Sequence, residues 1–491
     1  MARKAESPTK QKRRLAARRR ALDARKGRIS GNAADNCFQI QDALKWLIDQ
    51  NIFMGLALHG NTTWIPIELV TLTLLWIWSA TPQLTEAFVD ARVKTEKLGG
   101  RVATTSYQGL MKALLSSTSK LMPLLKTRLH QLMKTIGAKH FKIAGWIVIA
   151  FDGSRETASR TISNELAFSA KNYGQGKNAK NRNKQNIKDS KKLVPPPPQV
   201  WLTMLWHVGL GVAWCWKLGP SNASERIHVK ELIQTGDFPG KTLFVGDAGF
   251  VGYDLWKLIS DQGHNFLVRV GGNVNLLKGL CDHTHHNHSR DGRDIVYCWP
   301  ESMRTELPPL RLRLVKCRIG NNRNVWLLTS VLDKKNLSNK DMVTLYQKRW
   351  GIELEFRALK QTFNRRKLRC RSSERVLVEI EWSIFGMAVI ELMALKEQLP
   401  KAVPPEKLSF AQSLTALRHS LNNLKDRPEF LDDFQTMLGN AVIDDYERKK
   451  LKQGRYKPTR KKKKPCGEPY IEIASKEHRR LLDKLELQNA A

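Results

Sequence analysis

The stretch WIVIAFDGS, residues 146–154, decides the class of fold that we expect. Its first six residues are apolar and rich in β-branched and aromatic side chains, which is typical of a buried strand ending in Asp152. The run KTLFVGD, residues 241–247, has the same form and ends in Asp247. Because ligands gather at the carboxyl ends of strands in open α/β sheets, we expect the two aspartates to converge. The alternative is that each is an ordinary turn former or helix cap.

The whole chain has 491 residues, which is long enough for several domains. Apolar clusters at three-to-four spacing predict helices before Gly145, and strands alternate with helices after it. The expected fold class is therefore α/β. The expected segments before the insertion are a basic disordered arm over 1–30, a helical N-terminal DNA-binding domain over 31–140 and the first part of the core over 141–270. A β-rich insertion over 271–330 follows. The second part of the core, over 331–400, contains the helix discussed below, and it is followed by a C-terminal helical region over 401–447 and a basic tail over 448–491.

The formal net charge of +37 requires a partner of opposite sign. Most of it lies in three segments poor in apolar residues, 1–28, 171–192 and 448–464. Solubilising tails are one interpretation of such segments. Contact with nucleic acid is the better one, because releasing counterions makes dispersed Lys and Arg favourable on a phosphate backbone. Membrane binding is disfavoured, since no basic segment continues into an amphipathic apolar face.

The seven scattered cysteines form no CxxC pair, which fits a reducing cytosol. The basic N-terminus lacks a following apolar region and therefore does not resemble a signal peptide. The longest apolar run, residues 69–80, is too short to span a bilayer and predicts a buried core helix. We therefore expect a cytoplasmic protein.

The stretch YQKRWGIELEFRALK, residues 346–360, predicts a helix with a chemically unusual edge. At 100° per residue, four polar side chains fall within a sector of about 60° beside the apolar stripe. They are Tyr346, Arg349, Glu353 and Lys360. Glu355 falls on the far side, where we expect a solvated charge. The simplest alternative is an Arg–Glu ion pair that only stabilises the helix.

Three carboxylates in one pocket repel each other unless a cation is present. If Asp152, Asp247 and Glu353 meet, one or two Mg²⁺ ions would resolve the repulsion, because Mg²⁺ prefers oxygen ligands and phosphate substrates. Such ions activate a water or a 3′-hydroxyl for displacement at a phosphodiester. The pattern therefore indicates metal-dependent chemistry on nucleic acid.

The spacing Tyr346–x2–Arg349–x3–Glu353–x6–Lys360 resembles the YREK signature of the insertion-sequence-four family of DDE transposases. The blocks RWGIE, IAFDGS and VGDAGF around Glu353, Asp152 and Asp247 also resemble family blocks. The resemblance extends over roughly residues 140–395 and does not include the basic tails.

The resemblance implies an RNase H-like core with a β-rich insertion between Asp247 and Glu353. Asp152, Asp247 and Glu353 would form the catalytic and metal-binding triad, with Mn²⁺ able to replace Mg²⁺. Tyr346, Arg349 and Lys360 would contact DNA phosphates. Such a protein would cut transposon ends and join them to target DNA, as a homodimer on two ends, in a bacterial cytoplasm at the nucleoid. A catalytically silent DNA-binding protein and a nuclease without strand transfer remain alternatives.

Three further features are less specific. Arg155 follows Asp152 closely in the sequence. Its side chain would either contact the substrate or belong to an ordinary turn. Trp326 lies one residue after the position that a base-stacking Trp occupies in the family. A shift of one residue turns a strand side chain to the opposite face, so we expect Trp326 in the core unless a bulge restores the stacking position. The His-rich stretch 283–288 matches no standard zinc spacing and predicts a loop.

Overall fold

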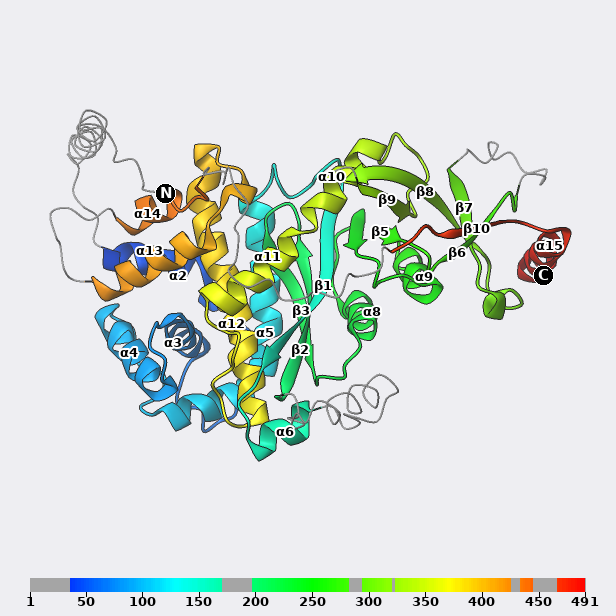
Figure 1. The fold of residues 1–491 in the computed structure, drawn as a ribbon. Helices are drawn as coiled ribbons and strands as arrows, with labels where there is room; N and C mark the ends of the chain where they lie inside the picture. The colour runs from blue at the N-terminus through cyan, green and yellow to red at the C-terminus, as the bar shows by residue number, and fades with distance from the viewer. Residues whose placement is uncertain are drawn as a thin grey trace, which may run out of the picture.

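The computed structural model describes residues 36–169, 197–281, 294–319, 323–424, 433–444 and 466–490. The strands of these residues form one ten-stranded sheet in the order β10-β6-β7-β8-β9-β5-β4-β1-β2-β3 (Figure 1). The basic segments 1–28, 171–192 and 448–464 and the His-rich stretch 283–288 lie outside the described residues.

Five neighbouring strands form the core of the sheet. They are β1 (Ile147–Thr157), β2 (Gln199–His207), β3 (Val212–Gly219), β4 (Thr242–Gly246) and β5 (Asn265–Val270). Strands β1, β2 and β3 are an antiparallel meander, and β4 and β5 run parallel to β1. This order, 3-2-1-4-5, is the RNase H-like arrangement, and it confirms the expected fold class.

Helices cover both faces of this core, which explains why its strands are continuously apolar. Helices α8 (Glu225–Thr235) and α9 (Tyr253–Asp261) lie on one side, and α5 (Tyr107–Ile136) and α12 (Ser373–Gln398) lie on the other (Figure 1). Most of α12 is buried all round. It is therefore the central helix of the molecule rather than a surface helix.

The N-terminal segment is helical, as predicted, and packs directly on α12. Its helices are α2 (Asn36–Leu47), α3 (Pro66–Trp78), α4 (Leu84–Lys97) and the start of α5. The apolar run 69–80 falls mainly in α3, whose Trp78 indole donates to the carbonyl of Gly386 in α12 at 3.0 Å. Helices α13 (Phe410–Asn422) and α14 (Phe434–Gly439) complete this layer. Among the described residues, none of the helices is both long and apolar enough to cross a membrane.

The insertion is β-rich, but it extends the core sheet instead of forming a separate one. Its strands are β6 (Asn275–Lys278), β7 (Ile295–Cys298), β8 (Leu310–Ile319) and β9 (Arg323–Thr329). Strand β9 pairs with β5 in antiparallel fashion, so hydrogen bonds run unbroken from the insertion to β1.

The end of the chain corrects the expected basic tail. Strand β10 (Tyr470–Ile473) pairs in parallel with β6, and α15 (Lys476–Ala490) follows it. Leu482 and Leu485 of α15 are buried against the insertion. The density of Lys and Arg before residue 465 obscured this short apolar pattern.

The stretch 346–360 is not one straight helix. It is divided among α10 (Asn339–Lys348), α11 (Gly351–Arg357) and a π-helical turn, η3 (Ala358–Thr362). Between the two α-helices the backbone hydrogen bonds shorten to three-residue steps, including Glu353 N–H to Trp350 C=O at 3.1 Å. An ideal helical wheel therefore fails for side chains beyond Trp350, as Glu355 shows below.

Candidate active site

The two aspartates lie beside each other on adjacent parallel strands. The parallel pairing of β1 with β4 ends at Ala150 and Val245. Asp152 follows on β1, and Asp247 follows the end of β4. Contrary to the prediction, β1 does not end at Asp152, because its pairing with β2 continues to Thr157. The aspartates nevertheless occupy the carboxyl end of the parallel part of the sheet.

Backbone amides orient both aspartates. Asp152 accepts a hydrogen bond from the N–H of Gly153 at 2.8 Å, and Asp247 accepts one from the N–H of Gly249 at 2.7 Å. Burial raises the pKa of Asp152 to about 6, and the neighbouring Asp247 and Glu353 carboxylates add to the rise. The Gly153 amide and the Arg349 guanidinium oppose it. The three predicted acids are therefore close enough to interact.

Arg349 lies between two of these acids. Its guanidinium is 3.3 Å from a Glu353 oxygen and 3.7 Å from an Asp152 oxygen, and the residue is only 7% exposed. The Tyr346 ring lies on its other side, with its centroid 5.6 Å from the guanidinium carbon. Three of the four predicted edge residues thus belong to one cluster.

Within the described ranges, no group of three or more His, Cys, Asp or Glu side chains is arranged so that it could hold a metal ion.

Lys360, the fourth edge residue, has a different partner. Its ammonium lies 3.7 Å from the carboxylate of Glu156, which is fully buried. The Ser154 hydroxyl donates to the same carboxylate oxygen at 3.3 Å. Burial raises the pKa of Glu156 to about 7, although Lys360 and Ser154 oppose the rise.

Sequence reasoning missed Glu156, although a signal was present. Asp152, Ser154 and Glu156 alternate along one extended strand, so they share a face. Alternate polar residues after a fully apolar run indicate that the strand continues with one face turned to the site.

Sequence reasoning also missed Glu225, a fourth acid near the aspartates. It begins helix α8, and its side chain passes so close to Gly153 that a Cβ there would collide with it. Burial, then Asp152 and Asp247, raise the pKa of Glu225 to about 7. Acidic residues are common in the first turn of a helix, because the helix dipole stabilises negative charge there. The sequence therefore did not distinguish Glu225 from an ordinary residue at the start of a helix.

The remaining predicted residues lie outside the cluster. The Arg155 guanidinium stacks 4.2 Å from the Trp201 ring centroid. Trp326 is partly buried against the core, with the Lys316 ammonium 5.2 Å from its ring centroid. A contact of either residue with DNA stays a prediction.

Glu355 corrects the sequence analysis, which placed it in solvent. It is only 6% exposed and lies near Glu391 of α12. The kink at Arg349–Trp350 and the packing of α12 on α11 turn this side chain inward.

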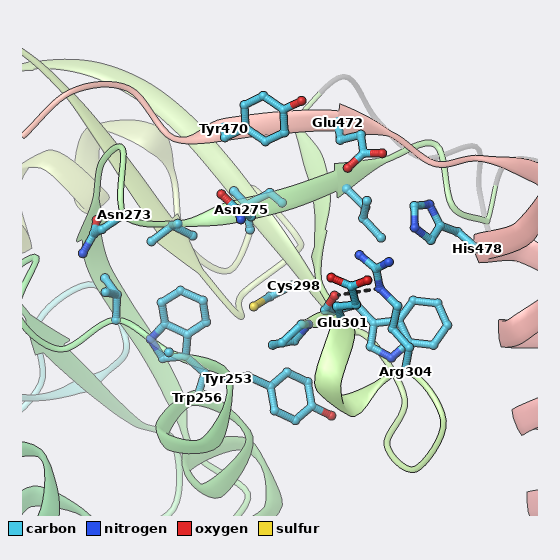
Figure 2. Close-up of a pocket in the computed structure, with 17 residues that line it drawn as sticks. Tyr253, Trp256, Asn273, Asn275, Cys298, Glu301, Arg304, Tyr470, Glu472 and His478 are labelled. Carbon is cyan, nitrogen blue, oxygen red and sulfur yellow. Dashed lines mark hydrogen bonds between the residues drawn. The ribbon is translucent and has the colours of Figure 1, made fainter.

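A cavity of about 570 Å³ lies apart from these acids, between α9, the insertion and β10 (Figure 2). Two of its aromatic polar groups already have partners: the Tyr253 hydroxyl donates to Pro308 C=O at 2.6 Å, and the Trp299 indole donates to Leu307 C=O at 2.7 Å. None of the predicted site residues lines it. This cavity is therefore separate from the predicted site.

Comparison with known proteins agrees with the geometry. The transposase DDE domain family matches residues 213–387, which include Asp247 and Glu353. Transposase InsG for insertion sequence element IS4 of Escherichia coli (strain K12) is 28% identical over 233 residues, or 45% of this chain. The match spans 51% of that protein, about half its length.

Among solved structures, a cryo-EM structure of the piggyBac transposase synaptic complex with hairpin DNA aligns with a TM-score of 0.37 and 12% identity, over 85% of this chain and 87% of that one. Residues 213–387 match the transposase DDE domain family, and a little under half of the chain is similar to a transposase of an insertion sequence element.

Proposed function

We propose that this protein is a transposase that cuts DNA at the ends of a transposon and joins the freed 3′-hydroxyl to target DNA. One observation carries the proposal: Asp152 and Glu353 both contact Arg349, and Asp247 lies close enough to Asp152 to raise its pKa. Burial and the neighbouring carboxylates raise the pKa of Asp152, and a perturbed pKa of this kind is typical of functional sites. The match to the transposase DDE domain supports the choice of reaction.

The three carboxylates would hold Mg²⁺, or Mn²⁺ in its place. Carboxylate oxygens are the ligands that these cations prefer, and one guanidinium does not balance three acids. Arg349 contacts two of the three acids, so metal binding requires its ion pairs to open. A bound metal lowers the pKa of water or a hydroxyl and stabilises charge on the leaving oxygen.

The DNA contacts follow from the cations beside the acids. Lys360 is partly exposed next to the cluster and remains available to a phosphate oxygen. Arg349, once released from the acids, and the Tyr346 hydroxyl would hold neighbouring phosphates. We propose double-stranded DNA as the partner, and a homodimer when two transposon ends are paired.

The test uses Asp152→Ala, Asp247→Ala and Glu353→Ala with a labelled transposon end and Mg²⁺. Each variant should lose cleavage while its affinity for the DNA end is retained. Glu231→Ala is the matched control, because Glu231 only pairs with Lys217 at 2.7 Å on the surface.

Cleavage retained in all three variants would reject the site. Cleavage by the wild type without joining would instead indicate a nuclease, and DNA binding without cleavage would indicate a silent DNA-binding protein.

A further inference from the structure

A short segment after the π-helical turn η3 carries an unusual density of cations. NRRKLRCRSSER, residues 364–375, contains six Lys or Arg residues and one acid, Glu374. The segment begins beside the candidate active site, because the N–H of Arg366 donates to the carbonyl of Lys360 at 3.2 Å. It ends in the first turn of α12, which begins at Ser373. These cations therefore lie along a path that leads away from the site.

Two arginines of this segment point inward and belong to the fold. Arg365 is only 3% exposed, and its guanidinium donates to the Ser383 hydroxyl at 2.8 Å and to the carbonyl of Ile77 at 2.9 Å. Arg369 pairs with the buried carboxylate of Glu379 at 2.9 Å. Each of these two cations has internal partners, as a cation inside a protein requires.

Three other cations of the segment point outward. Arg366, Lys367 and Arg371 are exposed, and among the described residues none of their side chains has an ion-pair or hydrogen-bond partner. Their backbone is nevertheless fixed. Lys367 forms a bridge with Thr157 at the end of β1, and the carbonyl of Arg371 accepts a hydrogen bond from the Thr161 hydroxyl at 2.7 Å. Unpaired cations on a fixed backbone suit an external anion, because no internal ion pair has to break when the anion binds.

The row of cations continues onto helix α5. Arg375 donates to the side-chain oxygen of Gln108 at 2.8 Å, and both residues line a cavity of about 590 Å³. A second cavity, of about 680 Å³, shares Lys112 and Ser116 with the first and extends to Arg101. Together the two cavities form one groove. Most of its lining side chains are polar, and among the described residues that line it none is acidic. Cations and hydroxyls are the groups that contact phosphates.

We propose that these cations form one surface, the basic track, which holds the phosphate backbone of the DNA duplex that extends from the acid cluster. The basic track consists of Arg366, Lys367, Arg371, Arg375, Lys112 and Arg101. The inference rests on the proposed function, which supplies the DNA and the bond to be cleaved. The cations are spread over several elements instead of converging on one point, so they match a polyanion with regularly spaced charges better than a single small anion.

The test measures binding of the full-length protein to a labelled duplex that contains the transposon end, over a range of salt concentrations. One variant replaces Arg366, Lys367 and Arg371 together by Gln. The slope of log K against log salt should become shallower by about 2 to 3, because each lost phosphate contact removes about 0.9. These side chains are exposed and unpaired, so the variant should fold normally, which circular dichroism checks.

A matched control loses the same charge elsewhere. It replaces Lys217, Lys257 and Lys334 together by Gln, and each of these lysines already pairs with an acid, at 2.7, 2.8 and 2.7 Å respectively. Its salt slope should change by less than about 1, because paired lysines make no phosphate contact.

Hydroxyl-radical footprinting adds a readout of position. The wild type should protect a continuous stretch of the duplex from the cleaved bond outwards. The variant of Arg366, Lys367 and Arg371 should lose protection in the middle of this stretch, and Arg101→Gln with Lys112→Gln should lose it at the far end. Both variants should cleave bound DNA at a rate within a few-fold of the wild type when the protein is saturating, because the acid cluster is intact.

An unchanged salt slope and footprint in the first variant would overturn the inference, and the basic track would then serve another anion, such as an acidic protein. Equal changes in that variant and in the control would overturn it as well, because net charge alone would then decide the affinity. Either result leaves the proposed function standing if Asp152→Ala, Asp247→Ala and Glu353→Ala lose cleavage. Cleavage retained in those three variants rejects the proposed function instead.

Discussion

The two faces of helix α11 handle acidic side chains in opposite ways. On one face Glu353 is about one-third exposed, and the Arg349 guanidinium joins it to Asp152. On the other face Glu355 is buried beside Glu391, without any cation in contact. The first face keeps its acids paired with a cation, and these pairs would exchange partners in the metal and DNA binding that we propose. The second face keeps protonated groups, because burial without a cation favours the neutral form.

The largest expected difference between the faces is catalytic. Glu353→Gln should lower the rate of DNA-end cleavage by on the order of a thousandfold, because a ligand of the proposed metal site is lost. Glu355→Gln should leave the rate within a few-fold of the wild type. The measurement is single-turnover cleavage of a labelled transposon end. Equal losses in the two variants would mean that the faces do not differ in function.

The next effect concerns the counter-ion of the first face. Arg349→Gln leaves Asp152 and Glu353 without their shared cation, and it should lower the free energy of unfolding by about 1 to 3 kcal/mol. This range is below that for fully buried pairs, because Glu353 is partly exposed. Urea unfolding of Arg349→Gln and of Arg349→Gln with Glu353→Gln provides the check. The double variant should recover part of the loss, and no recovery would show that the ion pair is unimportant.

A smaller effect, dependent on pH, is expected on the second face. The folded protein holds the pKa of Glu355 near 8, above the value of about 4.5 for a free Glu, so the folded state binds more protons than the unfolded state between these values. The associated stability is fully present below about pH 4.5 and is lost as the pH rises towards 8. Glu355 should contribute about 1 kcal/mol per pH unit to this slope.

Glu355→Gln and Glu391→Gln should flatten this slope in urea unfolding measured from pH 5 to pH 8. Glu231→Gln should retain it. A wild-type stability that does not fall over this interval would contradict the burial of a protonated pair.

The smallest effect concerns how Lys360 is held. Glu156→Gln removes the negative charge that pairs with the Lys360 ammonium. The affinity of the protein for the transposon end should therefore change about fivefold, which corresponds to roughly 1 kcal/mol. The change should vanish in a Lys360→Gln background, which a double-mutant cycle of DNA binding would show. An undiminished effect in that background would assign Glu156 a role in folding alone.

The sequence predicted the parts of the site that depend on local pattern. Apolar strands that end in Asp152 and Asp247 are visible without tertiary information, and so is the helical spacing of Arg349 and Glu353. Glu355 was misplaced because the wheel assumes one straight helix. Instead, the backbone hydrogen bonds near Trp350 span three residues, and the helical turn widens again in the π-helical segment η3.

The acids that were missed depend on packing between distant segments. Glu156 gains its role from Lys360, and Glu225 reaches the aspartates only because α8 packs over Gly153. Likewise, no local pattern indicates that the segment around Tyr470 pairs with β6, since the partner strand lies far earlier in the chain. Local periodicity therefore predicts the elements, but not which buried charges meet.

The pairing of β10 with β6 has a consequence for protein synthesis. The ribosome makes β6 long before β10, so the outer edge of β6 has no partner while translation continues. An unpaired edge is a template for another chain, and nascent proteins are vulnerable to such contacts. A product that terminates before residue 470 would keep every carboxylate of the candidate active site and yet expose this edge. Strand β10 thus protects the end of the sheet opposite β3, and that protection begins only when residues 470–473 have been made.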